Sequence, residues 1–487
     1  MNIYLHAFSA LTKLLFASVV FFAPLVSLAN ADTAKELVQK TWEKLGGPEL
    51  HSFQYTYSGT ENSFGQSYEP LGKWPAYSIE SKTRSINLHS FSWREDLPQK
   101  RSRNENPARG GGEPSGPRGP IFVKGEFAWI QIAQNYLPNP WAYSERLHQL
   151  LATPHAVLKH AFSQQLALAQ TVINGEKIST VSFTDSKKID IKITIDQNLF
   201  VKQIDVQFIV NSYGKVNATT RFNDYRKIQS IYFPYSIKQE INGFETQNYA
   251  VETFIPKFDF DPEIPEKIQA TNLMQNLTPI LIGDGIYLIA GSHNVVAIEM
   301  DKHFLIVDAP LTNEYTKRVF DAIKKINPSK PIRYVVNTHH HVDHFGGVAH
   351  AFIESSTVIT HYSNEELYKK YFPQINTQLI SAPILFVKDQ IRFEDSKNTV
   401  LIIHAKGNNH ASDMLMVYLP NKKILIQADM FSSSIAGPVN SNRYDPFVQE
   451  LFEIIKEKKI SIEKIIPLHG PIVSYQEFLT IVNSSAK

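Results

Sequence analysis

The sequence predicts a protein of the α+β and α/β classes, with a mainly antiparallel β domain followed by a layered α/β domain. In the first half, many segments alternate apolar and polar residues, as half-buried strands do. In the second half, short apolar strands alternate with helical patterns, which indicates α/β layers. A stretch with two prolines and four acidic residues, 258–268, separates the halves. The length of 487 residues fits two or three domains.

The composition narrows the classes of function. A formal net charge of +2 over this length gives no support for a nucleic-acid-binding protein. The chain has no cysteine, which excludes disulfides, thiolate metal sites and a cysteine nucleophile. A small-molecule substrate is the expected partner.

Residues 1–31 are predicted to be a signal peptide. Lys13 is the only charged residue before the apolar run 14–29, and the small-residue stretch "LANAD" follows. Cleavage after Ala29 or Ala31 fits the small-x-small rule, with an uncleaved anchor as the alternative. We therefore expect an exported protein, either periplasmic or secreted.

Residues 32–260 are predicted to form the mainly β N-terminal domain. A helix is expected over 33–47, where the spacing of apolar residues is helical and a glycine pair ends the pattern. Strict alternation over 188–196 places four isoleucines on one strand face, which predicts an antiparallel sheet with one wet face. Residues 97–120 are rich in proline, glycine and arginine and are predicted to be a flexible loop.

Part of this domain, 219–251, is similar to a hairpin pattern of outer-membrane lipoprotein-carrier-like half-barrels. In that family an amphipathic sheet cradles acyl chains. The resemblance makes the N-terminal domain a candidate for contact with lipid or a membrane surface.

Residues 261–275 are predicted to be a linker, and 276–487 the C-terminal domain. Its first polar cluster is "NTHHHVDHFGG", directly after the apolar run "IRYVV". Residues two apart in extended chain point the same way, so His339 and His341 can reach one metal ion. Asp343 and His344, on the following turn, can face a second. His340 is expected to point away.

The chain supplies further candidate ligands downstream. His410 lies in a loop before an apolar strand, and His469 follows the apolar run "KIIPL". Asp429 directly follows a buried strand, where a carboxylate needs a partner or a metal ion. In layered α/β folds, sites are built at strand ends, so these residues are expected to converge.

The pattern resembles the metallo-β-lactamase superfamily over 276–487, which implies a four-layer αβ/βα sandwich. The resemblance implies a first metal on His339, His341 and His410, and a second on Asp343, His344 and His469. It also implies that Asp429 bridges the two ions and that Asp308 supports a ligand. His303, His361 and His404 fit no ligand position. An aspartate at 429, where zinc β-lactamases of the main class have cysteine, resembles the glyoxalase II, lactonase and phosphodiesterase branches.

These branches imply a dinuclear-zinc hydrolase of an ester, thioester, lactone or related bond. The nucleophile would be a metal-bridging hydroxide, oriented by Asp343 as the catalytic residue. Iron and manganese are the alternative metals. Two other functions stay open: a mononuclear iron oxidoreductase resembling persulfide dioxygenases, and an exported lipid- or ligand-binding protein with a secondary metal domain.

Overall fold

The computed structural model describes residues 27–29, 31–96, 101–103, 109–111, 119–271, 277–375, 383–432 and 446–485. The predicted signal peptide lies outside these residues except for 27–29 and 31. Export therefore stays a prediction.

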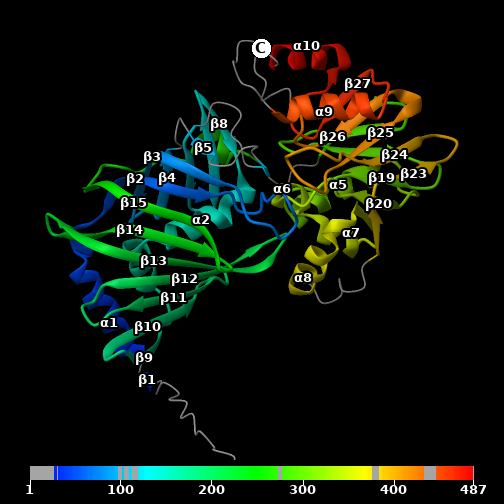
Figure 1. Cartoon of the computed structure of the whole chain (residues 1–487). Helices are drawn as coiled ribbons and strands as arrows, with labels where there is room; N and C mark the ends of the chain where they lie inside the picture. The colour runs from blue at the N-terminus through cyan, green and yellow to red at the C-terminus, as the bar shows by residue number, and fades with distance from the viewer. Residues whose placement is uncertain are drawn as a thin grey trace, which may run out of the picture.

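The N-terminal half forms one antiparallel sheet of 15 strands within the described residues (Figure 1). Along the sheet the strand order is β1-β9-β10-β11-β12-β13-β14-β15-β2-β3-β4-β6-β7-β8, with β5 paired to β3. The strands are β1 (Ser27–Ala29), β2 (Ser52–Asn62), β3 (Ala76–Asn87), β4 (Ser92–Asp96), β5 (Arg101–Arg103), β6 (Ile121–Lys124), β7 (Phe127–Ile132), β8 (Asn135–Pro138), β9 (Ala167–Ile173), β10 (Glu176–Thr184), β11 (Asp190–Ile195), β12 (Val201–Val210), β13 (Gly214–Ile228), β14 (Ile231–Ile241) and β15 (Phe244–Pro256).

One face of this sheet is buried under helices, as the alternation predicted. Along β11, Ile191, Ile193 and Ile195 are buried while the residues between them are not. The covering helices are α1 (Ala31–Lys44), α2 (Tyr143–Leu151) and α3 (Pro154–Ala161). The prediction of a mainly antiparallel N-terminal domain is confirmed.

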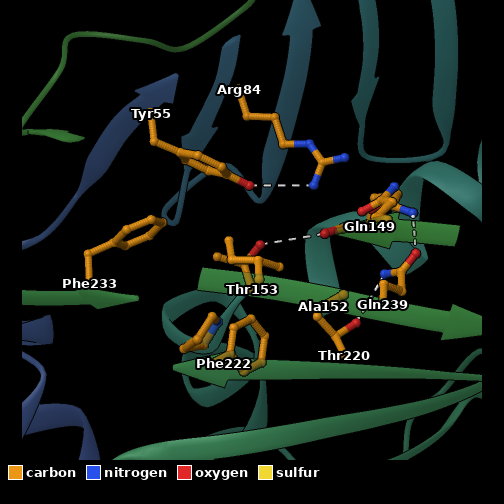
Figure 2. A pocket seen from close by; sticks show the side chains of 12 residues that line it. Tyr55, Arg84, Gln149, Ala152, Thr153, Thr220, Phe222, Phe233 and Gln239 are labelled. Atoms are coloured by element: carbon orange, nitrogen blue, oxygen red, sulfur yellow. Dashed lines mark hydrogen bonds between the residues drawn. The ribbon is translucent and has the colours of Figure 1, made fainter. Parts of the chain in front are cut away.

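Polar side chains fill part of the space between the sheet and α2. Gln149 donates a hydrogen bond to Gln239 Oε1 at 3.1 Å, and Gln239 donates to Thr220 Oγ1 at 3.0 Å (Figure 2). Arg84 Nη1 donates to the hydroxyl of Tyr55 at 3.4 Å in the same region. The interior of the sheet is therefore not a continuous apolar layer.

A neighbouring cavity has a charged lining. Lys82 pairs with Glu61 at 2.9 Å and with Glu95 at 2.7 Å, and Arg84 pairs with the same Glu95. Arg146, also buried, donates to two backbone carbonyls. Acyl chains bind to apolar walls, so this cavity does not support the expected contact with lipid.

The C-terminal half contains two sheets that face each other. The seven-stranded sheet consists of β16 (Ile280–Gly283), β17 (Ile286–Ile289), β18 (Val295–Glu299), β19 (Phe304–Val307), β20 (Ile332–Val336), β21 (Thr357–His361) and β22 (Ile384–Val387). The six-stranded sheet consists of β23 (Gln390–Glu394), β24 (Thr399–His404), β25 (Leu415–Leu419), β26 (Ile424–Gln427), β27 (Lys464–Pro467) and β28 (Val473–Ser474).

Helices cover the outer faces of both sheets and give four layers (Figure 1). On the seven-stranded sheet lie α5 (Asn313–Ile326), α7 (Val348–Ile353) and α8 (Glu365–Ile375). On the six-stranded sheet lie α9 (Pro446–Glu457) and α10 (Tyr475–Ser485). Strand residues such as Val336, Val417 and Ile426 fill the core between the sheets. The predicted αβ/βα sandwich is confirmed.

The two halves share a packed junction. Helix α8 packs against β13, and the rings of Tyr213 and Tyr371 lie 4.4 Å apart between centroids. Short helix α4 (Glu266–Gln269) lies within the predicted linker. Of the predicted flexible loop, Arg101–Arg103 forms β5, and Gly110 and Gly111 are buried. Residues 97–100, 104–108 and 112–118 lie outside the described residues. Within the described residues, no helix is both long and apolar enough to span a membrane.

Candidate metal centre

The cluster after β20 occupies the end of a parallel strand pair. Strands β19 and β20 run parallel, and the chain continues from Val336 through the histidines into the short helix α6 (Val342–Phe345). His341 is the residue before this helix and has extended backbone. This places His339 and His341 on extended chain and Asp343 and His344 on the first helical turn, as the spacing predicted.

Two groups of potential ligands meet here. In each group, one ligand atom per residue lies within 4.8 Å of the others. The first group consists of three buried histidines, His339, His341 and His410, with the partly buried Asp429. The second group consists of His293, Asp343, His344 and His469. The structure thus brings together all seven predicted site residues and adds His293.

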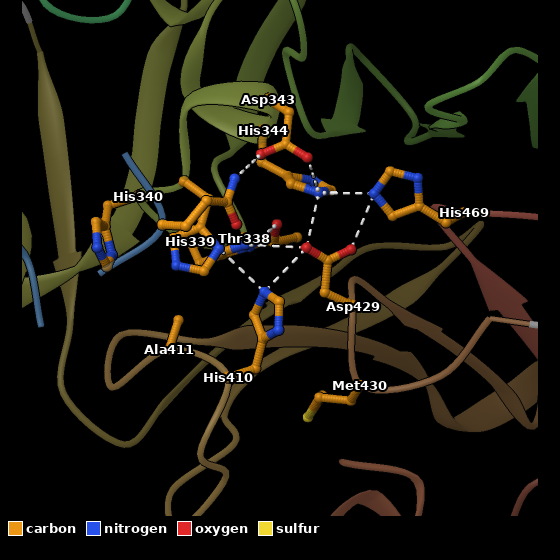
Figure 3. A network of polar contacts seen from close by, with 12 residues as sticks. Thr338, His339, His340, Asp343, His344, His410, Ala411, Asp429, Met430 and His469 are labelled. Atoms are coloured by element: carbon orange, nitrogen blue, oxygen red, sulfur yellow. Dashed lines mark hydrogen bonds and ion pairs between the residues drawn. The ribbon is translucent and has the colours of Figure 1, made fainter. Parts of the chain in front are cut away.

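Asp429 lies between the two groups (Figure 3). Its Oδ2 atom is 3.0 Å from His410 Nε2 and 3.3 Å from His339 Nε2 in the first group. Its Oδ1 atom is 2.9 Å from His469 Nε2 in the second group, while His344 Nε2 lies 3.2 Å from Oδ2. The backbone φ of Asp429 is 56°, a left-handed conformation that aspartate tolerates better than most residues. One carboxylate therefore serves both groups.

His344 and His469 each form a hydrogen bond through Nδ1 on the outer side of the ring, which turns Nε2 towards the cluster. His469 Nδ1 lies 3.1 Å from the carbonyl oxygen of Ser292, and a carbonyl only accepts, so Nδ1 carries the proton. His344 Nδ1 likewise donates to Asp308, at 2.5 Å. The inward Nε2 atoms of His344 and His469 lie 3.0 Å apart. In the neutral rings these two atoms face each other lone pair to lone pair, an arrangement that a metal ion beside them stabilises, so the residues fit a bound metal ion.

Asp308 supports this arrangement from outside the ligand groups. It directly follows β19, has a left-handed φ of 68°, and accepts hydrogen bonds from the backbone N–H and the hydroxyl of Thr338 at 2.8 and 3.0 Å. Through its bonds to Thr338 and His344, the Asp308 carboxylate holds both the loop after β20 and the His344 ring in place. Carboxylate partners of this kind orient metal-binding histidines.

The electrostatics favour the metal-binding protonation states at His339 and Asp429. At His344 and His469 burial lowers the pKa, but the carboxylates around them, Asp429 first, outweigh burial and raise it above its usual value. Burial and the neighbouring His344 ring lower the pKa of His339 to about 4, so its ring is neutral at pH 7. Burial alone would raise the pKa of Asp429, but the surrounding histidines, His344 first among them, lower it well below its usual value. Neutral imidazole and ionised carboxylate are the forms that coordinate metal ions.

Access to the centre differs between the groups. His339 is fully buried, and His410 is 7% exposed. In the second group the side chains of Asp343 and His469 are 30% and 20% exposed. A ligand from solvent therefore meets the second group first.

Other histidines of the region lie outside both groups. His340 is buried and turned away from the cluster, with Nδ1 2.7 Å from Asp413 Oδ1 (Figure 3). His404 Nε2 lies 2.9 Å from a backbone carbonyl, and its ring packs beside His361. His303 packs against Tyr334. None of these rings belongs to either ligand group within the described residues.

His293 is the residue that sequence reasoning missed. It lies in the loop between β17 and β18, and its Nε2 atom is 3.2 Å from Asp343 Oδ2. Its ring centroid is 4.3 Å from that of His469. The segment "IYLIAGSHN" places it just after a strand, which is the same signal that pointed to the other candidate ligands.

A family model for the metallo-beta-lactamase superfamily matches residues 288–476, which contain both ligand groups. The C-terminal domain belongs to the metallo-beta-lactamase superfamily. The expected family assignment is confirmed for this domain, and the N-terminal sheet lies outside the match. A metallo-beta-lactamase domain with these ligand groups is consistent with a metal-dependent hydrolase.

Two curated relatives are similar to parts of the chain. It is 24% identical to the linear primary-alkylsulfatase of Pseudomonas sp. over 227 residues, covering 37% of this chain and 42% of that protein. It is 35% identical to an alkyl/aryl-sulfatase of Saccharomyces cerevisiae over 69 residues, covering 14% of this chain and 11% of that protein. The chain therefore spans less than half the length of these relatives.

Solved structures similar to the metallo-beta-lactamase domain come from several organisms. A metallo-beta-lactamase from Hirschia baltica is 18% identical, with a TM-score of 0.34, and covers 43% of this chain and 98% of its own. The rubredoxin oxygen:oxidoreductase of Desulfovibrio gigas is 21% identical, with a TM-score of 0.35; the match covers 43% of this chain and 60% of that chain.

Proposed function

We propose that this protein is a dinuclear-metal hydrolase that cleaves an ester, thioester, lactone or related bond of a small molecule. The observation that carries the proposal is the position of Asp429, whose two oxygens face histidines of both ligand groups at 2.9 to 3.3 Å. A carboxylate between two sets of nitrogen ligands is suited to bridging two cations.

The proposed ligands follow from the two groups. His339, His341 and His410 would hold the first ion, Asp343, His344 and His469 the second, and Asp429 both. Imidazole and carboxylate without thiolate suit zinc, with iron or manganese as alternatives. When bound, such ions supply Lewis acidity and lower the pKa of a coordinated water from 15.7 towards ~7.

Asp343 is the proposed proton acceptor. Its Oδ1 accepts a hydrogen bond from Gln66 Nε2 at 2.9 Å, and its Oδ2 lies 3.2 Å from His293 Nε2. These two contacts hold the carboxylate at the solvent-facing edge of the centre, where a water molecule can approach. Asp343 Oδ2 would orient that water and accept its proton, so no serine or cysteine nucleophile is required.

The chemistry of the centre favours bonds with an anionic leaving group. Esters, thioesters and lactones release an oxygen or sulfur anion, whereas amides require protonation of an amine. The similarity to a linear primary-alkylsulfatase adds alkyl sulfate esters as a second candidate substrate class, because they also release an anion. Penicillins and carbapenems are disfavoured, because cleavage of their amide bond needs that protonation.

The proposal is tested by metal analysis followed by a substrate screen. Purified full-length protein is loaded with zinc, its metal content is measured, and it is assayed with p-nitrophenyl acetate, an acyl thioester, an acyl lactone and dodecyl sulfate. Two zinc ions per chain and turnover of one of these substrates support the proposal. One iron per chain with oxygen consumption on a persulfide would support the oxidoreductase instead. Co-purified acyl lipid without turnover would support a lipid-binding protein.

A further inference from the structure

A loop of the N-terminal domain, residues 63–68 between β2 and β3, lies against the metal centre. Its backbone bonds to the C-terminal domain: Val342 N–H donates to the Gly65 carbonyl at 3.3 Å, and Ser412 N–H donates to the Tyr68 carbonyl at 2.8 Å. We name residues 63–68 the inner loop. These bonds fix it on both sides of the histidine cluster.

The inner loop contacts two proposed metal ligands directly. His341 Nε2 lies 2.8 Å from the carbonyl oxygen of Ser67. Gln66 Nε2 donates to Asp343 Oδ1 at 2.9 Å. Ser67 Oγ also lies 3.0 Å from Nε2 of the neighbouring His340. Both domains thus provide atoms at the centre.

The Ser67 contact determines which nitrogen of His341 faces the first ligand group. Because a carbonyl oxygen can only accept, His341 must carry its proton on Nε2. Its Nδ1 atom then presents a lone pair towards His410, whose Nε2 lies 3.0 Å away. Metal-binding histidines depend on such an outer partner for tautomer and orientation. For His341 this partner comes from the N-terminal domain.

A second N-terminal segment, which contains Gly110 and Gly111, packs against the same His341 ring. Gly110 N–H donates to the Asn409 carbonyl at 2.8 Å, and Gly111 N–H donates to the Gln66 carbonyl at 3.0 Å. A Cβ atom on Gly111 would lie 2.8 Å from Cε1 of His341 and 2.1 Å from Oε1 of Gln66. Only glycine fits here without displacing one of these two side chains.

We propose that the inner loop and Gly111 make the N-terminal β domain a structural part of the metal centre, with Gln66 and Ser67 positioning Asp343 and His341. The inference rests on the proposed function in that it assumes that His341 and Asp343 bind metal. It assigns the N-terminal domain a role at the centre itself, in place of a separate carrier function.

The test measures metal retention in three full-length variants. Gln66→Leu removes the donor to Asp343, and Gly111→Ala forces a methyl group against His341. Ser212→Ala is the matched control, because Ser212 Oγ donates across the same junction to the Val342 carbonyl at 3.3 Å but touches no proposed ligand. Thermal unfolding checks that each variant is folded.

The readouts are zinc affinity in competition with a chromogenic chelator and the visible spectrum of the cobalt-substituted protein. Loss of an outer partner typically weakens metal affinity by roughly 10- to 100-fold. We expect losses in this range and a changed cobalt spectrum for Gln66→Leu and Gly111→Ala, and neither for Ser212→Ala. If Gly111→Ala fails to fold, Gln66→Leu alone decides.

The outcomes separate the inference from the proposed function. If the unchanged protein binds two ions and Gln66→Leu has the same affinity and cobalt spectrum, the inference is wrong and the proposed function stands. If the unchanged protein binds no metal, the proposed function fails and the inference fails with it.

Discussion

Replacing Asp429 by asparagine removes one negative charge from the middle of the centre and changes little else. Asparagine has nearly the same shape and tolerates the left-handed backbone at this position, where φ is 56°. The substitution therefore isolates the charge, whereas alanine would add backbone strain and empty space. The expected result is weaker binding of both metal ions.

The magnitude follows from the distances. The carboxylate oxygens lie 2.9 to 3.3 Å from inward-facing histidine nitrogens, so a cation bound by those nitrogens lies within about 4 Å of the charge. At an effective dielectric constant of about 20, one such pair of unit charges is worth about 4 kcal/mol. That energy corresponds to a loss of roughly a thousandfold in metal affinity per ion.

The assay is competition with a chromogenic chelator, together with hydrolysis of an activated ester. His404→Ala is the control, because His404 bonds to the Ser412 carbonyl and belongs to neither ligand group. We expect His404→Ala to keep metal affinity and turnover within a few-fold of the unchanged protein. Asp429→Asn with an affinity in the same range as this control would refute the bridging role.

Three further predictions follow from the same contacts. Asp308→Asn, which weakens the acceptor for His344 Nδ1, should reduce affinity for one of the two ions by roughly 10- to 100-fold, measured by the same competition; an unchanged affinity for both would contradict the supporting role. Turnover of penicillins should be at least about a hundredfold poorer in kcat/KM than turnover of the best ester, thioester or lactone, on the order of 2.7 kcal/mol, and the reverse order would overturn the branch assignment. The third prediction concerns folding stability at acidic pH. Burial lowers the pKa of His148 to about 3 and that of His155 to about 4. Because the unfolded chain takes up these protons below pH ~6.5 and the folded domain does not, stability is full above that pH and falls on acidification, by about 2 kcal/mol per histidine at pH 5. Urea unfolding at pH 7 and pH 5 should show this loss, and His148→Phe should show a smaller one; equal losses in both proteins would contradict the assignment.

Most of the centre could be predicted because its residues carry local signals. The spacing of His339, His341, Asp343 and His344 forces them onto one strand end and the following helical turn. Asp429 stood out as a carboxylate directly after a buried strand. The C-terminal layers followed from the alternation of strand and helix patterns.

The contribution of the N-terminal domain could not be predicted from the sequence. Gln66 and Ser67 lie more than 270 residues before the proposed ligands that they contact, and nothing in their local sequence distinguishes them. The Ser67 contact uses a backbone carbonyl, which every residue type possesses. Gly111 belongs to a stretch whose composition predicts a solvated loop. Its burial could not be predicted, because it depends on a domain junction that composition does not encode.

The most direct test of the account is a zinc titration of metal-free, full-length protein with ester or sulfate-ester hydrolysis as the readout. Chelation should abolish turnover, and activity should return only as zinc is added, reaching its maximum at two equivalents per chain. This result is predicted because both ligand groups and the Asp429 carboxylate between them belong to one centre. Turnover that survives metal removal, or that needs one equivalent of iron and no zinc, would contradict the account.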